Sequence, residues 1–155
     1  MKLLFLCTHN ACRSILAEAI TYRLAEGQLT VASAGSAPTG KVHPLTLEQL
    51  ETRGYNTQSL TSKSWDDLKD YHPDIVITVC DQAAGESCPI WLGPLLKLHW
   101  GLPDPTHLDN PELTVDAAFD LVISTIEARV KALLSLDTTK SIDALKAELQ
   151  ALQNI

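Results

Sequence analysis

Four short apolar runs recur along the chain, and each has the length and continuity of a strand buried on both faces of a sheet. The third is the clearest, because residues 75–79 follow one another without a charged side chain. The predicted strands are Lys2–Leu6, Leu29–Ala34, Asp74–Val79 and Leu95–Trp100.

Between and after these runs, apolar residues return every three or four positions, as on one face of a helix. Gly27 and Gly54 directly follow two of these stretches and favour helix ends, and Pro44 suits a first helical turn. The predicted helices are Ser14–Glu26, Pro44–Arg53, a short one from Ser64 to about Tyr71, Val115–Leu134 and Ile142–Leu152.

The alternation of strands and helices predicts an α/β fold, namely a four-stranded parallel sheet flanked by helices on both faces. We expect one domain over residues 1–136 and a C-terminal helical extension over residues 137–155. The extension has a narrow apolar seam that is too short for a stable coiled coil, so it should pack on its own domain or on a partner. The seam comprises Ile142, Leu145, Leu149 and Leu152.

The carboxyl ends of the predicted strands should carry the chemistry of the protein. Right-handed crossovers bring these ends to one edge of a parallel sheet, where ligands usually bind. Cys7, Cys80 and the segment Gly101–Pro105 each follow a predicted strand directly. We therefore expect these three to meet.

Composition narrows the possible partners. The net charge of −7, from 12 basic and 19 acidic residues, argues against binding to nucleic acid or to an anionic membrane. The opening apolar run ends at Cys7, too early for a signal peptide, and no stretch is long enough to span a membrane. We expect a cytoplasmic protein, whose cysteines are reduced thiols rather than structural disulfides.

The segment between the first predicted strand and the first predicted helix reads Cys7-Thr8-His9-Asn10-Ala11-Cys12-Arg13-Ser14, hereafter the Cys7 loop. Its successive backbone N–H groups and the helix N-terminus can form a pocket for a tetrahedral anion. The same positive field should lower the pKa of Cys7 and make it a nucleophile. Arg13 can bind two oxygens at once. Ser14 can donate to the Cys7 sulfur or cap the helix.

Simpler interpretations compete with this one. A buried cysteine beside a surface arginine needs no function, and buried cysteines often serve only as small apolar residues, which is our interpretation of Cys12. A metal site around Cys7, His9 and Cys12 is conceivable, but we expect no metal. The chain has no C-x-x-C pair, so neither a zinc ribbon nor a thioredoxin-like site is indicated.

With C-x5-R-S after the first strand, the chain resembles the low-molecular-weight tyrosine phosphatases, and specifically their arsenate reductase branch of the thioredoxin-coupled type. The resemblance extends to about residue 134. Besides the Cys7 loop it includes Ser33-Ala34-Gly35, Thr78-Val79-Cys80, Cys88-Pro89 and His99-Trp100-Gly101-x-x-Asp104-Pro105. It implies that Asp104, which alone would suggest only a turn, protonates the oxygen that leaves the oxyanion.

Two enzymatic functions fit this resemblance. In a thiol-dependent arsenate reductase, Cys7 forms an adduct with arsenate, Cys80 attacks the Cys7 sulfur so that arsenite leaves, and Cys88 then takes over the disulfide. Cys80 is placed for this because it ends a buried strand, and Cys88 because it follows a polar segment. The alternative is that Cys80 only packs in the core and Cys88 is incidental.

A low-molecular-weight protein tyrosine phosphatase would hydrolyse phosphomonoesters with Cys7, Arg13, Asp104 and water alone. The phosphatase branch carries aromatic residues after its Asp-Pro, where this chain has Thr106-His107. The aromatic residues of the phosphatase branch are thus missing here. The two additional cysteines, Cys80 and Cys88, favour the reductase. A non-enzymatic oxyanion-binding protein is a third hypothesis, and Cys7 together with Asp104 disfavours it.

The expected ligand is arsenate, and phosphate or sulfate should bind in the same loop. We expect thioredoxin as the reductant, or alternatively glutaredoxin with glutathione, and no cofactor. The alternative stays open because the interval between Cys80 and Cys88 is one residue longer than in thioredoxin-coupled members of the family.

Some members of the family bind potassium beside the oxyanion loop. The resemblance maps the potassium ligands onto Asn10, Glu18, Ser33 and Thr61, but Lys63 stands where a further carboxylate is expected. An ammonium group cannot bind potassium, although it could occupy the same place. We therefore predict no potassium requirement.

Overall fold

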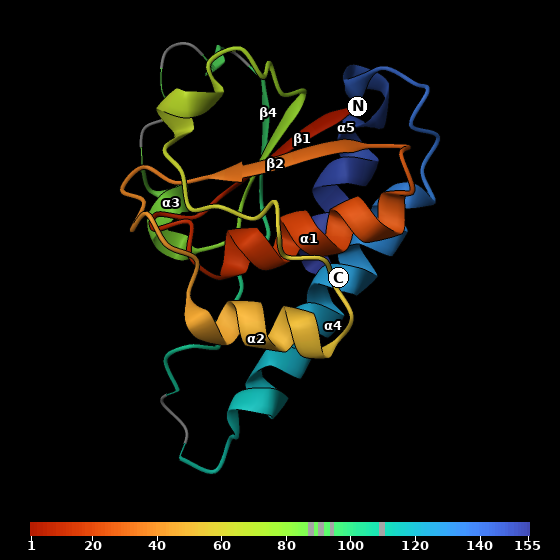
Figure 1. Cartoon of the computed structure of the whole chain (residues 1–155). Helices are drawn as coiled ribbons and strands as arrows, with labels where there is room; N and C mark the ends of the chain where they lie inside the picture. The colour runs from red at the N-terminus through yellow and green to blue at the C-terminus, as the bar shows by residue number, and fades with distance from the viewer. Residues whose placement is uncertain (87–88, 90–91, 94, 109–110) are drawn as a thin grey trace.

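Four parallel strands form the centre of the computed structural model, which describes all residues except 87–88, 90–91, 94 and 109–110. The strand order is β2-β1-β3-β4, and every neighbouring pair is parallel (Figure 1). All four strands lie within the predicted runs. They are β1 (Lys2–Leu6), β2 (Thr30–Ala34), β3 (Ile75–Thr78) and β4 (Leu96–His99).

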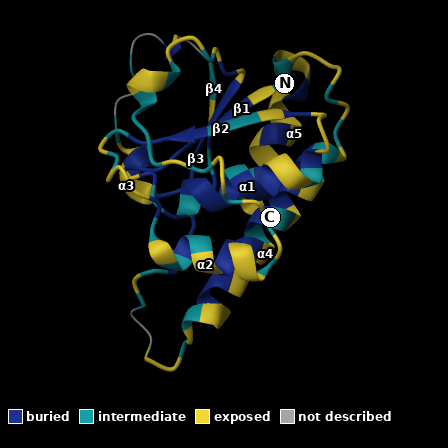
Figure 2. Cartoon of the chain, viewed as in Figure 1, coloured by how far each residue is buried: buried dark blue, intermediate teal, exposed yellow. Residues whose placement is uncertain are grey.

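Side chains of successive strand residues point to opposite faces, so the sheet supports two cores of unequal size. The larger core takes Phe5 and Ile77 from the sheet, and it includes Trp100, whose ring lies 5.7 Å from that of Phe5. The smaller core takes Leu4 and Val76. Figure 2 shows β1 and β3 almost wholly buried, as their continuous apolar runs predict, whereas the edge strands β2 and β4 are partly exposed.

Long helices cover the larger core. They are α1 (Arg13–Ala25), α2 (Pro44–Thr52), α4 (Val115–Leu134) and α5 (Ile142–Ala151), the last followed by the 3-10 helix η3 (Leu152–Asn154). The smaller core is covered by the 3-10 helix η1 (Trp65–Leu68) and neighbouring residues. The predicted α/β fold with a sheet covered on both faces is thus confirmed, although the second layer is much thinner than the first.

The C-terminal segment packs against the main body of the protein. Leu145, Leu149 and Leu152 of the apolar seam are buried in the larger core. Gln153 adds a polar contact, because its Oε1 accepts a hydrogen bond from the backbone N–H of His99 in β4 at 2.8 Å.

One element was not predicted. Residues 81–84, which looked like part of a polar loop, form the short helix α3 (Asp81–Ala84). The Cys80 sulfur caps this helix by accepting a hydrogen bond from the N–H of Ala83 at 3.4 Å. A single helical turn has no hydrophobic period, so the sequence pattern could not reveal it.

The carboxyl ends of β1, β3 and β4 lie at the same edge of the sheet. Their register pairs Leu6 with Thr78, and Thr78 with His99. The chain therefore delivers Cys7, Cys80 and the segment after Trp100 to one place, as predicted. Among the described residues, no helix combines the length and apolar character needed to cross a membrane.

Candidate active site

Asn10 holds the Cys7 loop in shape. Its backbone lies in the left-handed region, with φ of 47°, which asparagine tolerates better than most residues. Its side-chain Nδ2 donates to Oγ of Ser14 at 2.8 Å and to Oγ of Ser33 at 3.0 Å, and its Oδ1 accepts from the N–H of Lys63 at 2.9 Å. One buried amide thus connects the loop to α1, to β2 and to the segment before η1.

Gly35 allows the end of β2 to lie directly against the loop. A Cβ atom at this position would come within 2.5 Å of the Thr8 carbonyl oxygen and 2.7 Å of the Cys7 carbonyl oxygen. Both neighbours are backbone atoms that cannot move aside cheaply. Only glycine therefore fits here, which accounts for the Ser33-Ala34-Gly35 motif.

The loop presents unpaired donors, as an oxyanion site requires. Within the described part of the chain, the backbone N–H groups of residues 10–13 donate to no other group. Arg13 is held at two points, because its Nη1 donates to the Leu102 carbonyl at 3.1 Å and its Nη2 lies 3.8 Å from Oδ2 of Asp104. Its Nε is buried and has no partner among the described residues. An oxyanion could use these N–H groups together with the Arg13 guanidinium.

These groups surround a cavity of about 230 Å³. Sequence reasoning identified most of its lining but missed three residues, namely Thr39, His43 and Thr106. The segment with Thr39 and His43 runs along the loop, since their N–H groups donate to the carbonyls of His9 and Ala11. The only sequence signal for Thr39 and His43 was that His43 precedes the proline that opens α2. The complete lining is Cys7, His9, Ala11, Cys12, Arg13, Thr39, His43, Asp104 and Thr106.

The Cys7 and Cys80 thiols lie close enough to influence each other's ionisation. Their interaction, together with burial, raises the pKa of Cys7. The same interaction lowers the pKa of Cys80 against the effect of burial, with help from the N–H groups of Thr8 and Ala83. The expected lowering of the Cys7 pKa is therefore wrong for this arrangement, in which the pKa of Cys80 is lowered instead.

Cys12 behaves as a buried apolar residue. Its side chain is 7% exposed, and burial raises its pKa to about 12 despite a hydrogen bond with Thr46. The thiol is thus protonated near neutral pH and is a poor nucleophile.

Asp104 is ionised at the mouth of the cavity. Burial alone would raise its pKa, but hydrogen bonds from Thr106, together with the charges of Arg13 and His107, outweigh burial and hold the pKa below its usual value. The Thr106 hydroxyl and N–H both donate to Oδ1, at 2.6 and 2.9 Å. The carboxylate is therefore fixed in direction, with its other oxygen toward Arg13.

Ser14 differs in part from expectation. The α1 helix begins at Arg13 with Cys12 at its N-cap position, so the prediction that Ser14 caps the helix is wrong. The Ser14 hydroxyl is fully buried and accepts a hydrogen bond from Asn10. Its donation to the Cys7 sulfur stays a prediction.

Lys63 lies where the resemblance would place a potassium ion. Its ammonium is 3.6 Å from Oε1 of Glu18 and donates to the Thr61 carbonyl at 3.1 Å. The same Glu18 oxygen accepts from Ser33 at 2.6 Å. A positive charge of the protein itself thus occupies the oxygen cluster behind the loop, and the residues present do not fit a bound potassium ion.

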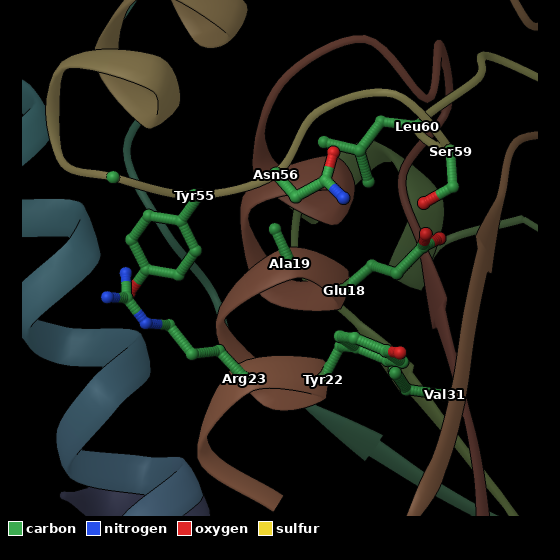
Figure 3. A pocket seen from close by; sticks show the side chains of 10 residues that line it. Glu18, Ala19, Tyr22, Arg23, Val31, Tyr55, Asn56, Ser59 and Leu60 are labelled. Atoms are coloured by element: carbon green, nitrogen blue, oxygen red, sulfur yellow. The ribbon is translucent and has the colours of Figure 1, made fainter. Parts of the chain in front are cut away.

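A larger cavity of about 290 Å³ lies on the outer side of α1 (Figure 3). Its charged groups are already engaged. Arg23 lies 4.4 Å from the centre of the Tyr55 ring and donates to the Arg53 carbonyl, and Glu18 belongs to the Lys63 cluster. We therefore assign the chemistry to the smaller cavity, which contains the nucleophile.

Cys88, the predicted third thiol, lies outside the described residues, so its position relative to Cys80 stays a prediction. The structure brings together the other predicted residues. Cys7, Arg13 and Asp104 line one cavity, and Cys80 contacts Cys7.

A cysteine in a loop after the first strand, an arginine six residues later at a helix N-terminus and a facing Asp-Pro are typical of enzymes that act on tetrahedral oxyanions. The chain belongs to the low molecular weight phosphotyrosine protein phosphatase family, whose model matches residues 2–151.

Within this family the chain is similar to arsenate reductases. An arsenate reductase of Bacillus licheniformis is 32% identical over 127 residues, which cover 82% of this chain and 90% of the relative. The structure of an arsenate reductase in the phosphate binding state superposes with a TM-score of 0.71 at 27% identity, covering 86% of this chain and 96% of that one. A thioredoxin-dependent arsenate reductase of Corynebacterium glutamicum is 33% identical, with a TM-score of 0.64 over 85% of this chain and 59% of that one.

Proposed function

We propose that the protein is a thiol-dependent arsenate reductase, which converts arsenate to arsenite. The observation that carries this proposal is the second thiol beside the predicted nucleophile, because Cys80 and Cys7 lie close enough for each to shift the pKa of the other. Hydrolysis of a phosphate ester has no need of that thiol, whereas reduction by two electrons does. The similarity to arsenate reductases supports the same conclusion.

In the first step the Cys7 proton passes to Cys80, and the Cys7 sulfur attacks the arsenic atom of dihydrogen arsenate. The bond from arsenic to one hydroxyl group breaks, and this hydroxyl leaves as water when it gains a second proton. Asp104 is ionised beforehand, so it must first take up a proton that the bound oxyanion brings, and it then delivers this proton to the leaving oxygen. Arg13 and the loop N–H groups stabilise the charge on the remaining oxygens.

In the second step Cys80 loses its proton to an oxygen of the departing arsenite, and its thiolate attacks the Cys7 sulfur. A Cys7–Cys80 disulfide forms, the S–As bond breaks, and its electron pair stays on arsenic, so arsenite leaves with both electrons. Cys88 then attacks Cys80, which releases the Cys7 thiolate and gives a Cys80–Cys88 disulfide. Thioredoxin reduces this disulfide, with glutaredoxin and glutathione as the alternative. The cytoplasm, which keeps such thiols reduced, is the expected location.

The test couples arsenate reduction to NADPH consumption through thioredoxin and thioredoxin reductase. Wild-type protein should consume NADPH only when arsenate is present, and Cys7→Ser should fall to background. Arg13→Lys should be severely impaired, because a point charge cannot replace the two-pronged guanidinium. Activity that survives in Cys7→Ser would remove the nucleophile from this scheme.

A phosphatase acting on phosphomonoesters is the second candidate, because the family and the Cys7 loop fit phosphate as well as arsenate. Hydrolysis of p-nitrophenyl phosphate, measured beside arsenate reduction, separates the two candidates. We expect weak hydrolysis that persists in Cys80→Ser, because hydrolysis consumes no second thiol. Efficient hydrolysis without arsenate-dependent NADPH consumption would favour the phosphatase.

A further inference from the structure

A buried hydroxyl group lies between the second thiol and a carboxylate. Oγ1 of Thr8 is 3.8 Å from the Cys80 sulfur and 2.7 Å from Oε1 of Glu86, and Thr8 is 5% exposed. Glu86 follows α3 and stands two residues before Cys88 in the sequence. The contact therefore links the Cys7 loop to the segment that leads toward the third thiol.

The Thr8 hydroxyl has only one proton to donate. A carboxylate oxygen can only accept, so the short contact directs this proton to Glu86. Thr8 then faces Cys80 with its lone pairs, and any hydrogen bond between them must come from a Cys80 S–H group. The contact with Glu86 thus withholds a donor from the Cys80 thiolate.

This donor becomes important once Cys7 has reacted. The interaction with Cys7 makes the largest contribution to the lowered pKa of Cys80. In the Cys7 adduct the sulfur has lost its proton and can no longer donate. Cys80 therefore loses its main stabilising partner at the stage where it must act as a thiolate, and the Thr8 hydroxyl is placed to replace it.

We propose that Glu86 is a positioning residue that retains the Thr8 hydroxyl before the reaction and releases it to Cys80 afterwards. The inference rests on the proposed function, in which Cys80 is the second nucleophile. Binding of the oxyanion supplies a cause for release, because it brings negative charge into the loop to which Thr8 belongs and repels the carboxylate. The presence of substrate thereby activates the second thiol.

Other charged groups lie near the two thiols. Arg13 on the loop favours the thiolate of Cys7, and Asp81 on α3 is paired with His99 of β4 at 2.9 Å. Asp81 thus offers a matched control, since it is a carboxylate on the segment of Glu86 that contacts His99 instead of Thr8.

The test follows the ¹³Cβ chemical shift of each cysteine against pH by NMR, since this shift reports ionisation without any reagent reaching the buried sulfur. In Glu86→Gln the amide can donate to Thr8, which frees the hydroxyl for Cys80. We expect the pKa of Cys80 to fall by about one unit, a tenfold gain in the ratio of thiolate to thiol at a fixed pH. In a Thr8→Val background the same substitution should have no effect, and Asp81→Asn should shift Cys80 less.

Two results would overturn the proposal. If Cys80 titrates in Glu86→Gln as in the wild type, the carboxylate does not withhold the hydroxyl. If Glu86→Gln causes an equal fall in the Thr8→Val background, the effect is one of charge alone. The titration needs no arsenate, so it also separates this inference from the proposed function. Should Cys80→Ser still reduce arsenate, the proposed function fails while the shift of Cys80 remains expected.

Discussion

The two thiols that contact each other are held by very different surroundings. Cys7 belongs to a loop fixed from several sides by the Asn10 amide, by the close approach of Gly35 and by the contacts of Arg13. Cys80 opens the four-residue helix α3. Asp81 of this helix forms an exposed pair with His99, and Glu86, two residues after the helix, accepts a hydrogen bond from Thr8.

The difference matches the two tasks. An oxyanion site must keep its donors aligned, so a rigid frame is an advantage. In the proposed relay the second thiol instead approaches first Cys7 and then Cys88, and disulfide formation requires two Cα atoms to come within about 7 Å. A single helical turn with few partners can rearrange at small cost.

The largest effects should come from the cysteines on the α3 side. Cys80→Ser should form the Cys7 adduct but release no arsenite unless an external thiol replaces it. Cys88→Ser should complete one turnover and stop with a Cys7–Cys80 disulfide, whereas wild-type protein without reductant should hold a Cys80–Cys88 disulfide. Peptide mapping of non-reduced protein after one equivalent of arsenate distinguishes these states, with Cys12→Ser as a control that should behave like the wild type.

A Cys7–Cys12 bond as the main product would show that the order of thiols is wrong. Sustained turnover of Cys88→Ser with thioredoxin would also contradict the relay. In that case an external thiol such as glutathione would take the place of the third cysteine.

Asp104→Asn tests the oxyanion site, which is the rigid one of the two regions. Formation of the adduct should slow by about a hundredfold, the lower range for loss of a general acid, and rapid-quench measurement of the first turnover reports it. Unchanged single-turnover kinetics would mean that another group or the solvent supplies the proton.

The pKa of Asp104 also predicts a dependence of stability on pH. Because folding lowers this pKa, the carboxylate adds stability above its ordinary pKa of about 4, and that contribution disappears as pH falls through the lowered value. Asp104→Asn should therefore melt slightly below the wild type near neutral pH, and the difference should vanish in acid. A difference that grows in acid would contradict this assignment.

Substitutions at two glycines test the difference between the Cys7 loop and the α3 side directly. Gly35→Ala places a methyl group against backbone oxygens, so we expect a loss of stability on the order of 2 kcal/mol or more, together with loss of oxyanion binding. Gly85→Ala, after α3, would meet its nearest atom at 3.7 Å and should be nearly neutral. Urea unfolding of both variants measures the contrast, and equal losses would refute the difference in rigidity.

The smallest expected effect concerns potassium. Because the Lys63 ammonium already neutralises Glu18, activity and melting temperature should be the same in potassium and sodium at matched ionic strength. Lys63→Ala tests this replacement more directly, because it removes the ammonium group from the oxygen cluster behind the loop. A several-fold gain of the wild-type protein in potassium alone would refute the replacement.

The elements whose apolar residues follow the spacing of a strand or a helix could be predicted from the sequence. The contacts between residues far apart in the chain could not. The buried strands and α4 follow from hydrophobic spacing, and the meeting of Cys7, Cys80 and Asp104 follows from topology. The Thr8–Glu86 contact joins residues 78 positions apart, and no local pattern reports it. The opposite pKa shifts of Cys7 and Cys80 arise because the fold brings the two thiols together, and no local sequence pattern reports them.

The contact of Gln153 with β4 has a consequence for self-association. β4 is an edge strand, and an uncovered edge offers free N–H and carbonyl groups to a strand of another molecule. Gln153 occupies one such N–H group, at His99, and Lys97 places a charge on the same strand. A chain shortened after Asp137 should therefore show its defect first as aggregation at high concentration, while freshly diluted protein still performs the chemistry of the Cys7 loop.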